Sequence, residues 1–504
     1  MLRKTISLVV CAACAACQLA NGWGQARADP PPVVLFVQQP QAQVAAATVG
    51  PTLLAPPRQT ADGSESRPFP SLRAALALAP AGALLRIGDG IWREQLLISR
   101  PVVLLGRGAG RTHILPPAGA RVAVEVRADH VQLYGLSIED ATVGIEFAGG
   151  AGHRLENVAL RHLAEAGLVA RGAEIAFTSG EVIDVAGGRT GRGIEVKGGS
   201  LDARRLTLQA AGRRAVVLEK ARGTLEDLDV RGSSLAAIQA TDGSDARVIR
   251  GEFDGQGGAA LYAGRARLTV DGAHVRHDEY AVIGSRGAEV IVLGGELTDY
   301  RIAGVAMVNS HGTVQRVLIA RGGLDGAISI TRADGKAPVL LLDNRIQDPG
   351  PLGVHITESA VTARGNSVTG ARPDREKDMG DAIFAIDSEL IIEQNVMRGN
   401  AGSGVSTLRT NVRLDRNGFI ENGRAGVLLL DRSHGTATGN LFERNALAGL
   451  ELGERSRATL RRNRFAGNPV LDIDTGCGKG LAGVAELEAG NTSAAPLRQR
   501  SCVE

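Results

Sequence analysis

Two sets of asparagines recur at a fixed interval near the C-terminal end of this 504-residue sequence. The first set is Asn395, Asn417, Asn440 and Asn463, and five residues after each member comes one of the second set, Asn400, Asn422, Asn445 and Asn468. An interval of 22 or 23 residues indicates a solenoid, in which one supersecondary unit stacks on the next. Stacked asparagines can hydrogen-bond to one another and to the backbone, so we predict a structural role for both sets.

The interval continues toward the N-terminus as a small residue followed by an apolar one. Fourteen such units begin at Gly144, Gly167, Gly193, Ala215, Ala237, Ala260, Ala281, Gly304, Ala327, Gly353, Ala382, Gly404, Gly426 and Gly449. The next position is apolar in every unit, from Ile145 in the first to Leu450 in the last. This agreement predicts one continuous elongated domain rather than several compact ones.

The repeat is too short for ankyrin or tetratricopeptide units and lacks their helical period. Leucine-rich repeats have this length, but here Val, Ile and Ala share the core positions with Leu. Short alternating segments favour strands, and in residues 353–357 we expect Val354 and Ile356 to be buried and His355 and Thr357 to face outward. We therefore predict an all-β, three-sided parallel β-helix over residues 61–472, with coils of about 22–23 residues. We expect glycine, 66 of the 504 residues, to serve the corners where φ must be positive.

The first residues have the pattern of a signal peptide. Arg3-Lys4, an apolar stretch from Ile6 and Ala26-Arg27-Ala28 predict cleavage after residue 28 and a secreted, periplasmic protein. Three cysteines lie inside this segment, so a lipid anchor remains an alternative. Cys477 and Cys502 remain, and we expect a disulfide that ties down a tail over residues 473–504. No later apolar run reaches 18 residues, so we expect no membrane span.

The remaining segments differ from the repeat in composition. Residues 29–60 are rich in Pro, Ala and Gln and are predicted to be a linker. Ser71 is a candidate cap for a short helix that extends through Ala79, and the helix could close the open N-terminal end of the solenoid. Between the units at Gly353 and Ala382 the interval is longest, and residues 372–381 form a charged insertion. Such an insertion is either a wall of a binding groove or a solvated loop.

Net charge excludes one class of partner. Without Arg3, Lys4 and Arg27 the chain has 54 basic and 54 acidic side chains, hence a formal charge of zero. No electrostatic argument for nucleic-acid binding remains.

The opening from Asp62 to Gly106 and the unit Asn-x-apolar-x-x-Asn-x-x-x-Gly-apolar resemble the secreted carbohydrate-binding and sugar-hydrolase proteins with a right-handed, pectin-lyase-like parallel β-helix. Residues 426–433, continued through Asn440, Asn445 and residues 454–456, are similar to part of the periplasmic mannuronan C5-epimerases. This resemblance implies a right-handed β-helix and an acidic polysaccharide as the partner. Those epimerases carry an Asp-Pro-His-Asp motif, whereas this chain has Asp348-Pro349-Gly350.

Two further resemblances are weaker. Residues 90–94 resemble the Gly-x-Tyr-x-Glu element of pectin methylesterases, but the aspartate and glutamine motifs of esterase chemistry do not follow. Copper-associated relatives of the repeat use soft ligands, which are scarce here.

The outward residues of the Gly-apolar strands form one face along the rod, which is our candidate groove. Going up, this face presents Glu146, Val169, Glu195, Val217, Gln239, Tyr262, Ile283, Ala306, Ser329, His355, Phe384, Ser406, Leu428 and Glu451. The part with Tyr262, Ser329, His355 and Phe384 suits a sugar ring best. The turns before these strands add His277, Asp278, Tyr280, Asp299, Tyr300, Arg301, Arg321, Asp325 and Asp348.

These residue types suit C5-proton abstraction from a uronate, which needs a base, an acid and a cation for the carboxylate. We expect His355 or His277 as base, Tyr280 or Tyr300 as acid, and Arg301, Arg321 or Arg375 as the cation. A hydrolase would instead use two carboxylates among Asp278, Asp299, Asp325 and Asp348. No cofactor is predicted, although neighbouring acids permit Ca²⁺.

Two functions follow as alternatives. The protein is a lyase or C5-epimerase of an acidic polysaccharide, or it is a non-catalytic polysaccharide-binding or scaffold protein of envelope or exopolysaccharide assembly. The sequence leaves the oligomeric state open.

Overall fold

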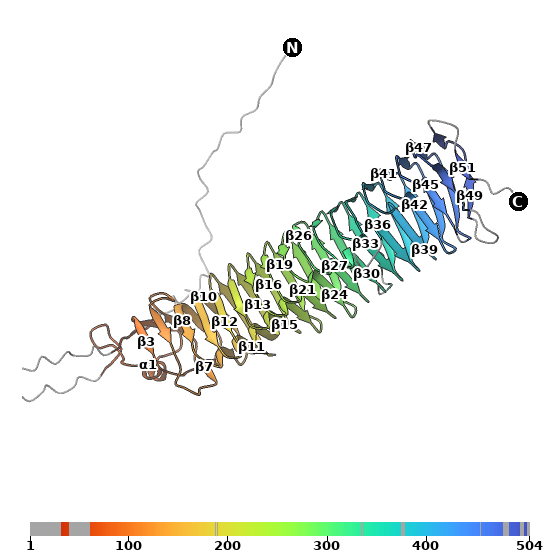
Figure 1. The fold of residues 1–504 in the computed structure, drawn as a ribbon. Helices are drawn as coiled ribbons and strands as arrows, with labels where there is room; N and C mark the ends of the chain where they lie inside the picture. The colour runs from red at the N-terminus through yellow and green to blue at the C-terminus, as the bar shows by residue number, and fades with distance from the viewer. Residues whose placement is uncertain are drawn as a thin grey trace, which may run out of the picture.

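The computed structural model describes residues 32–39, 61–186, 188, 190–333, 335, 337–373, 379–453, 455–476, 483–493 and 498–500. These residues wind into a rod of stacked parallel strands, with the first coils at one end and the last at the other (Figure 1). A typical coil contributes one strand to each of three faces, which we call the first, second and third face. The predicted all-β solenoid is thereby confirmed.

The first face contains the strands that begin the repeat unit: β4 (Leu96–Ile98), β7 (Val122–Val126), β9 (Val143–Phe147), β11 (Ala166–Thr178), β13 (Arg192–Arg204), β15 (Arg214–Glu219), β18 (Ala236–Thr241), β21 (Ala259–Gly264), β24 (Tyr280–Ser285), β27 (Ala303–Val308), β30 (Gly326–Thr331), β33 (Leu352–Thr357), β36 (Asp381–Ile386), β39 (Val405–Leu408), β42 (Ala425–Leu430), β45 (Ala448–Leu452), β48 (Leu471–Asp474) and β51 (Gln499–Arg500).

The second face follows in each coil: β1 (Val34–Val37), β2 (Ala83–Ile87), β5 (Val102–Leu105), β8 (Gln132–Glu139), β10 (Gly150–Leu163), β16 (Arg222–Glu226), β19 (Asp245–Ile249), β22 (Arg267–Asp271), β25 (Glu289–Leu293), β28 (His311–Gln315), β31 (Val339–Leu342), β34 (Ala360–Arg364), β37 (Glu389–Glu393), β40 (Asn411–Asp415), β43 (His434–Thr438), β46 (Arg457–Arg461) and β49 (Val484–Leu487).

The third face completes the coil: β3 (Gly90–Trp92), β6 (Thr112–Ile114), β12 (Glu181–Val185), β14 (Thr207–Ala211), β17 (Asp229–Arg231), β20 (Glu252–Asp254), β23 (His274–Arg276), β26 (Glu296–Thr298), β29 (Leu318–Ala320), β32 (Arg345–Gln347), β35 (Ser367–Thr369), β38 (Val396–Arg398), β41 (Gly418–Ile420), β44 (Leu441–Glu443), β47 (Arg464–Ala466) and β50 (Thr492–Ser493). The long strands β8, β10, β11 and β13 pass around a corner and contribute to two faces.

The repeated apolar position lies inside the rod, as predicted. Val354 pairs in register with Ile328 below and Ile383 above, and all three side chains are buried. Rows of Val, Ile, Leu and Ala fill most of the core. Near the C-terminal end Phe419, Phe442 and Phe465 stack, with ring centroids 5.1 and 4.8 Å apart. In-register stacking therefore places the same side-chain type in contact from coil to coil.

The first asparagine set forms a ladder at the corner between the second and third faces. The backbone N–H of Asn395 donates to Oδ1 of Asn417 (2.9 Å), and its side-chain Nδ2 donates to the Ala363 carbonyl (2.8 Å). The same pattern runs from Asn344 through Asn366 to Asn491, so the ladder is longer than the sequence analysis recognised. Each amide thus pairs buried backbone groups that the turn leaves without a strand partner.

Two more ladders support the other corners. Asn400, Asn422, Asn445 and Asn468 bond in the same way between the third and first faces, as predicted. Between the first and second faces, N–H groups donate to hydroxyls of the next coil: Ser388 N to Thr410 Oγ1 (3.2 Å) and Ser433 N to Ser456 Oγ (3.1 Å). The sequence analysis missed this hydroxyl ladder.

Glycines such as Gly399 (φ 65°) and Gly439 (φ 67°) serve corners with positive φ, as predicted, but many charged residues share this left-handed region. Arg321 (φ 55°) and Arg409 (φ 49°) are examples, and each pairs with an aspartate on a neighbouring coil. Left-handed backbone is unfavourable for residues with a Cβ. The hydrogen bonds and the close stacking of adjacent coils hold these residues there.

The N-terminal end differs from the prediction in one strand. Residues 34–37 lie in the segment expected to be a linker, but they form β1, which pairs in parallel with β2. The continuous apolar run Val34-Leu35-Phe36-Val37 explains this extra strand, because it can pair with the open edge of the first coil. The signal peptide and the rest of that segment lie outside the described residues.

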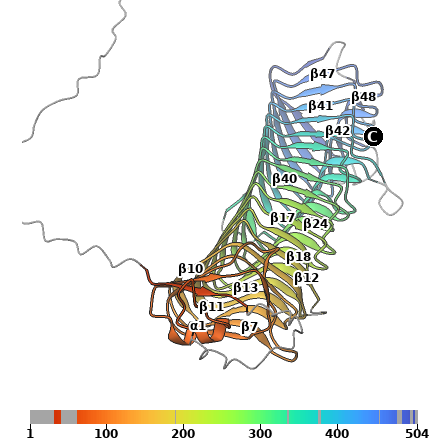
Figure 2. The same ribbon diagram turned by 90° about the vertical axis from the view of Figure 1, so that its left-hand side faces the viewer.

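Helix α1 (Leu72–Leu78) has Ser71 as its N-cap, and Ser71 Oγ accepts from Ala74 N (3.0 Å), as predicted. The Glu94 carboxylate accepts from the first two helical N–H groups. Leu72 and Ala75 are buried, and Figure 2 shows α1 at the N-terminal end of the rod. Its role in closing that end stays a prediction. No helix in the described ranges could span a membrane.

Coils continue past residue 472, where we expected a tail. Strands β49, β50 and β51 pair with the three strands of the preceding coil, and Asn491 extends the ladder. The interval from Asn463 to Asn491 is 28 residues, against 22 or 23 in the set that the sequence analysis recognised, which hid this coil in the sequence. Cys477 and Cys502 lie outside the described residues, so their disulfide stays a prediction.

We expect Asn440→Ala to destabilise the rod by about 1–3 kcal/mol, because it leaves Asn417 N and the Leu414 carbonyl unpaired in the interior. Val396→Ala, which truncates an exposed side chain of the third-face strand β38 two coils below, is the control and should cost less than about 0.5 kcal/mol. Denaturant unfolding followed by circular dichroism measures both. If both variants lose the same free energy of unfolding, the hydrogen bonds of Asn440 do not contribute specifically to stability.

Candidate functional site

The candidate site lies on the first face, midway along the rod. Ser329 in β30 and His355 in β33 are register partners, and Phe384 in β36 is the partner of His355 on the next coil. All three side chains point away from the core, while Val354 and Ile356 point into it. The outward and inward assignments of residues 353–357 are therefore confirmed.

Asp325 links two of these side chains. It immediately precedes β30, and its Oδ1 lies 3.0 Å from Nδ1 of His355. Ser329 Oγ donates to the other carboxylate oxygen (2.7 Å). A proton on Nδ1 that is shared with the carboxylate leaves Nε2 as the unprotonated nitrogen of a neutral imidazole. Asp325 thus orients His355 with Nε2 available as a base.

The His355 ring is only partly enclosed. Its side chain is 22 % exposed, and its centroid lies 5.9 Å from that of Phe384. Thr357 Oγ1 is 3.4 Å from Nε2. The imidazole is therefore held on three sides and still open to a ligand on the first face.

Tyr280 in β24 lies two coils below Asp325. The register row of Tyr280 continues through Ala303 to Gly326, both small, and Asp325 immediately precedes Gly326. Burial raises the pKa of Tyr280, the negative charges of Asp325 and Glu279 raise it further, and Arg301 opposes them. Tyr280 therefore stays protonated at neutral pH and can donate a proton toward the space above it.

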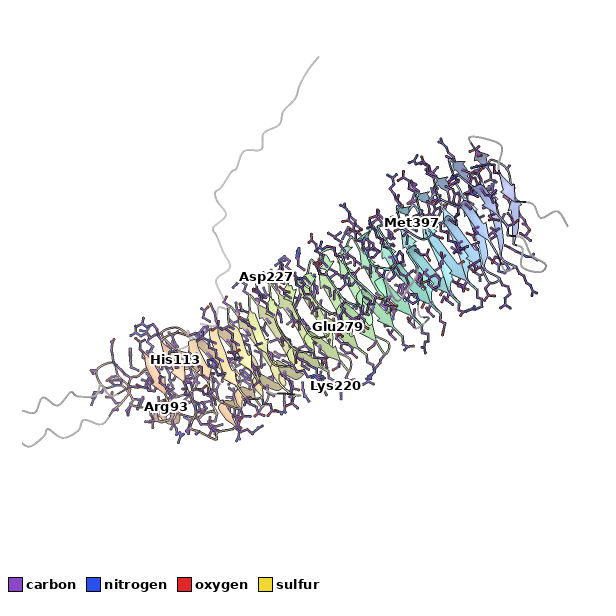
Figure 3. The ribbon with its side chains drawn as sticks, in the orientation of Figure 1. Arg93, His113, Lys220, Asp227, Glu279 and Met397 are labelled. Atoms are coloured by element: carbon purple, nitrogen blue, oxygen red, sulfur yellow. The ribbon has the colours of Figure 1, made fainter. Side chains whose placement is uncertain are left out.

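Arg301 forms an ion pair with Glu279 at the rim beside Tyr280. Figure 3 labels Glu279 midway along the rod, which marks the level of this rim. Both side chains are partly exposed, so the guanidinium can exchange this partner for the carboxylate of a ligand. Asp325 contacts His355 directly and acts on Tyr280 through its charge, while Tyr280 lies three coils below His355. Arg301 also acts on Tyr280 through its charge.

Asp381, which the sequence analysis placed at the end of the charged insertion, is instead a buried residue of this face. It begins β36 beside Leu352, is 8 % exposed, and accepts a hydrogen bond from Ser403 N (2.6 Å). Burial raises its pKa, although the Ser403 bond opposes the shift. The sequence offered one signal: an acid directly before the small-apolar start of a unit.

Several predicted residues lie elsewhere. His277, Arg321 and Asp348 occupy the corner between the third and first faces, each with left-handed backbone. His277 Nδ1 is 2.8 Å from Asp254 Oδ1, and Arg321 pairs with Asp299 (2.7 Å). These exposed pairs are outside the His355 group.

Tyr262 is on the first face, where its hydroxyl is 3.0 Å from Ser285 Oγ, but it lies several coils below His355. Arg375 lies outside the described residues.

Asp278 and Tyr300 are enclosed in the corner that carries the second asparagine ladder. Asp278 is 2 % exposed; its Oδ1 accepts from Gln256 N (2.7 Å), and its Oδ2 has no partner among the described residues. The Tyr300 hydroxyl is also buried without a described partner. Burial raises the pKa of both groups, that of Asp278 to about 8. Neither side chain reaches the first face.

Within the described residues, no group of three or more His, Cys, Asp or Glu side chains is placed to hold a metal ion. A cavity of about 560 Å³ is present, but it opens on the second face rather than on the first.

The comparisons with known proteins agree with this architecture. Residues 352–482 match the family described as "Right handed beta helix region". The coils before and after are paired to this part in the same register, and a change of hand would break that pairing. The chain is a right-handed parallel β-helix.

Several solved structures are similar to this chain at low sequence identity and with low TM-scores. Alginate lyase from Paenibacillus sp. str. FPU-7 is 14 % identical, covering 54 % of this chain and 91 % of its own, with a TM-score of 0.32. The A-module of the Azotobacter vinelandii mannuronan C-5 epimerase AlgE6 is 15 % identical, covering 84 % and 94 %, with a TM-score of 0.29. The Dettilon tailspike protein is 14 % identical, covering 60 % and 62 %, with a TM-score of 0.38. No curated protein matches the sequence significantly.

We expect Asp278→Asn to stabilise the protein increasingly between about pH 4 and pH 8. The raised pKa means that the folded chain holds this proton more tightly than the unfolded chain, so the stability it contributes is lost as pH rises toward 8. An asparagine there could donate to the coil below, as Asn422 Nδ2 does to the Met397 carbonyl. The gain at pH 8 should be about 1–3 kcal/mol.

Melting temperatures of the wild type and Asp278→Asn across this pH range test the expectation. Asp245→Asn, which changes an exposed aspartate, is the control. A pH-independent difference would mean that Asp278 is not a protonated buried acid.

Proposed function

We propose that the protein is a periplasmic or otherwise secreted enzyme that acts on an acidic polysaccharide as a lyase or C5-epimerase. One observation carries the proposal: the Asp325–His355 contact leaves an oriented imidazole nitrogen on an open face that also carries Tyr280. A plain surface histidine needs no carboxylate that is itself held by a hydroxyl, as Asp325 is by Ser329.

His355 is the base. Its Nε2 takes the C5 proton of a uronate, and the electron pair moves into the carboxylate to form an enolate. Asp325 stabilises the imidazolium that results, because its carboxylate faces the protonated Nδ1. Arg301 neutralises the charge that develops on the substrate carboxylate. The Arg301–Glu279 pair must open for this contact.

Tyr280 is the acid, and its protonated state at neutral pH supports this role. If it returns a proton to C5 from the opposite side of the ring, the product is the C5 epimer. If the enolate instead expels the C4 oxygen and Tyr280 protonates that oxygen, the chain is cleaved and an unsaturated uronate forms. Both routes use the same base and the same first step.

We expect the purified protein to produce either the ultraviolet absorbance of unsaturated uronates or an altered C5 epimer ratio by NMR, on a panel that includes alginate and polygalacturonate. His355→Gln and Tyr280→Phe should each lower the rate by about 10²–10⁴-fold, because each removes a proton-transfer group. The assay is run with and without Ca²⁺, since calcium dependence is open.

His162→Gln is the matched control, because His162 is an exposed corner histidine whose ring nitrogen is 3.7 Å from Asp184. It should leave the rate unchanged. Binding of a uronan without either product signal would refute the enzyme and would leave the non-catalytic binding or scaffold function.

A further inference from the structure

A trough lies on the second face in the C-terminal half of the rod, where β40 is labelled in Figure 2. Its cavity of about 560 Å³ is lined mainly by outward residues of β34, β37, β40, β43 and β46. We call it the second-face trough. None of the residues around Asp325 and His355 lines it.

Register pairing builds the trough from two rows. The first row is Ala360, Glu389, Asn411, His434 and Arg457; the second is Thr362, Ile391, Arg413, Thr436 and Thr459. Between the rows the side chains turn inward, and Gly435 has none, so backbone forms the floor. Because coils repeat every 4.8 Å or so, five coils make the trough roughly 20 Å long.

The lining combines apolar surface with hydrogen-bonding groups. Ile391 is 39 % exposed, and the methyl groups of Thr362, Thr436 and Thr459 add further apolar surface. The threonine hydroxyls and the Asn411 amide lie among them. A pyranose ring has the matching chemistry, because its C–H groups form an apolar face and its hydroxyls lie at the edge.

The charged side chains of the trough and its regular coil spacing indicate which class of ligand it binds. Arg413 is 62 % exposed, its ion pair with Glu393 is long (3.8 Å), and Arg457 and His434 line the same trough. Glu389 and Glu486 lie toward its two ends. The guanidinium groups of Arg413 and Arg457, which lie between these two glutamates, suit a carboxylate-bearing chain. The coil spacing is close to the length of one sugar residue, so a linear polymer can repeat its contacts from coil to coil.

We infer that the second-face trough binds a linear acidic oligosaccharide of several residues along the rod axis, as a site separate from the first-face centre. The ligand class rests on the proposed function. The trough would hold a long polymer on the protein while the first face acts on another part of it, so long chains would bind more tightly than short ones.

Binding is measured by calorimetry with size-defined alginate and polygalacturonate oligosaccharides, using His355→Gln protein so that no turnover occurs. Adding Arg413→Ala and Arg457→Ala should weaken octasaccharide binding about tenfold, and by less at high salt, where the charges are screened. Thr436→Trp, which fills the trough with an exposed ring, should have the same effect. Trisaccharide binding should change little.

Arg222→Ala with Arg247→Ala is the matched control, because these exposed arginines lie lower on the same face, outside the trough. On the wild-type background, the trough variants should turn over trisaccharides at the normal rate. If the proposed function fails, turnover is absent but octasaccharide binding still depends on the trough.

Octasaccharide affinity that is unchanged by the Arg413/Arg457 and Thr436 variants would overturn the inference, even if turnover is normal. A sedimentation experiment that finds a dimer dissociated by the same variants would also overturn it, since the trough would then be a contact between two copies of the chain.

Discussion

In-register stacking of one coil on the next is the constraint on which the rest of this structure depends. The backbone N–H and C=O groups of a strand pair with those of the strands above and below, but many of these groups in the corners between strands have no such partner. The asparagine and hydroxyl ladders satisfy those corners, because each amide or hydroxyl accepts from the N–H of the coil below. The same alignment keeps rows of apolar side chains in contact along the interior. Corners with left-handed arginine and aspartate are tolerated because so many stacked contacts determine their conformation.

A rod built this way displays chemistry as rows. Most outward rows on the first face carry unrelated side chains. The candidate site arises where a residue of a neighbouring turn contacts side chains of such a row. Asp325 does this from the turn before β30, where it orients His355 and accepts from Ser329. On the second face the rows themselves form a trough, because inward residues and Gly435 leave the space between them open. One architecture thus provides a candidate reaction centre and a candidate holding surface.

The periodic part of the fold was accessible from the sequence because each coil must present a small and then an apolar residue at the same place. The lower rungs Asn344 and Asn366 were missed, since the insertion before Asp381 lengthens the interval between Asn366 and Asn395 although the bond between them is kept. Asp278 and Tyr300 were placed in the site because they flank exposed residues of the same turns. The structure encloses them instead, since their positions coincide with the second ladder. Alternation along a strand assigns faces well, but it does not say which turn residues point inward.

By itself the sequence determined the solenoid, the register of its coils, the asparagine ladders and the outward position of His355. These depend on local alternation and on a fixed interval, both of which are written along the chain. Only the tertiary structure decided that Asp325 rather than a nearer acid supports His355, that Asp381 belongs to the same face, and that a trough lies on the second face. Those relations join residues one or more coils apart, and the path of each turn through space, not its spacing in sequence, sets which side chains meet.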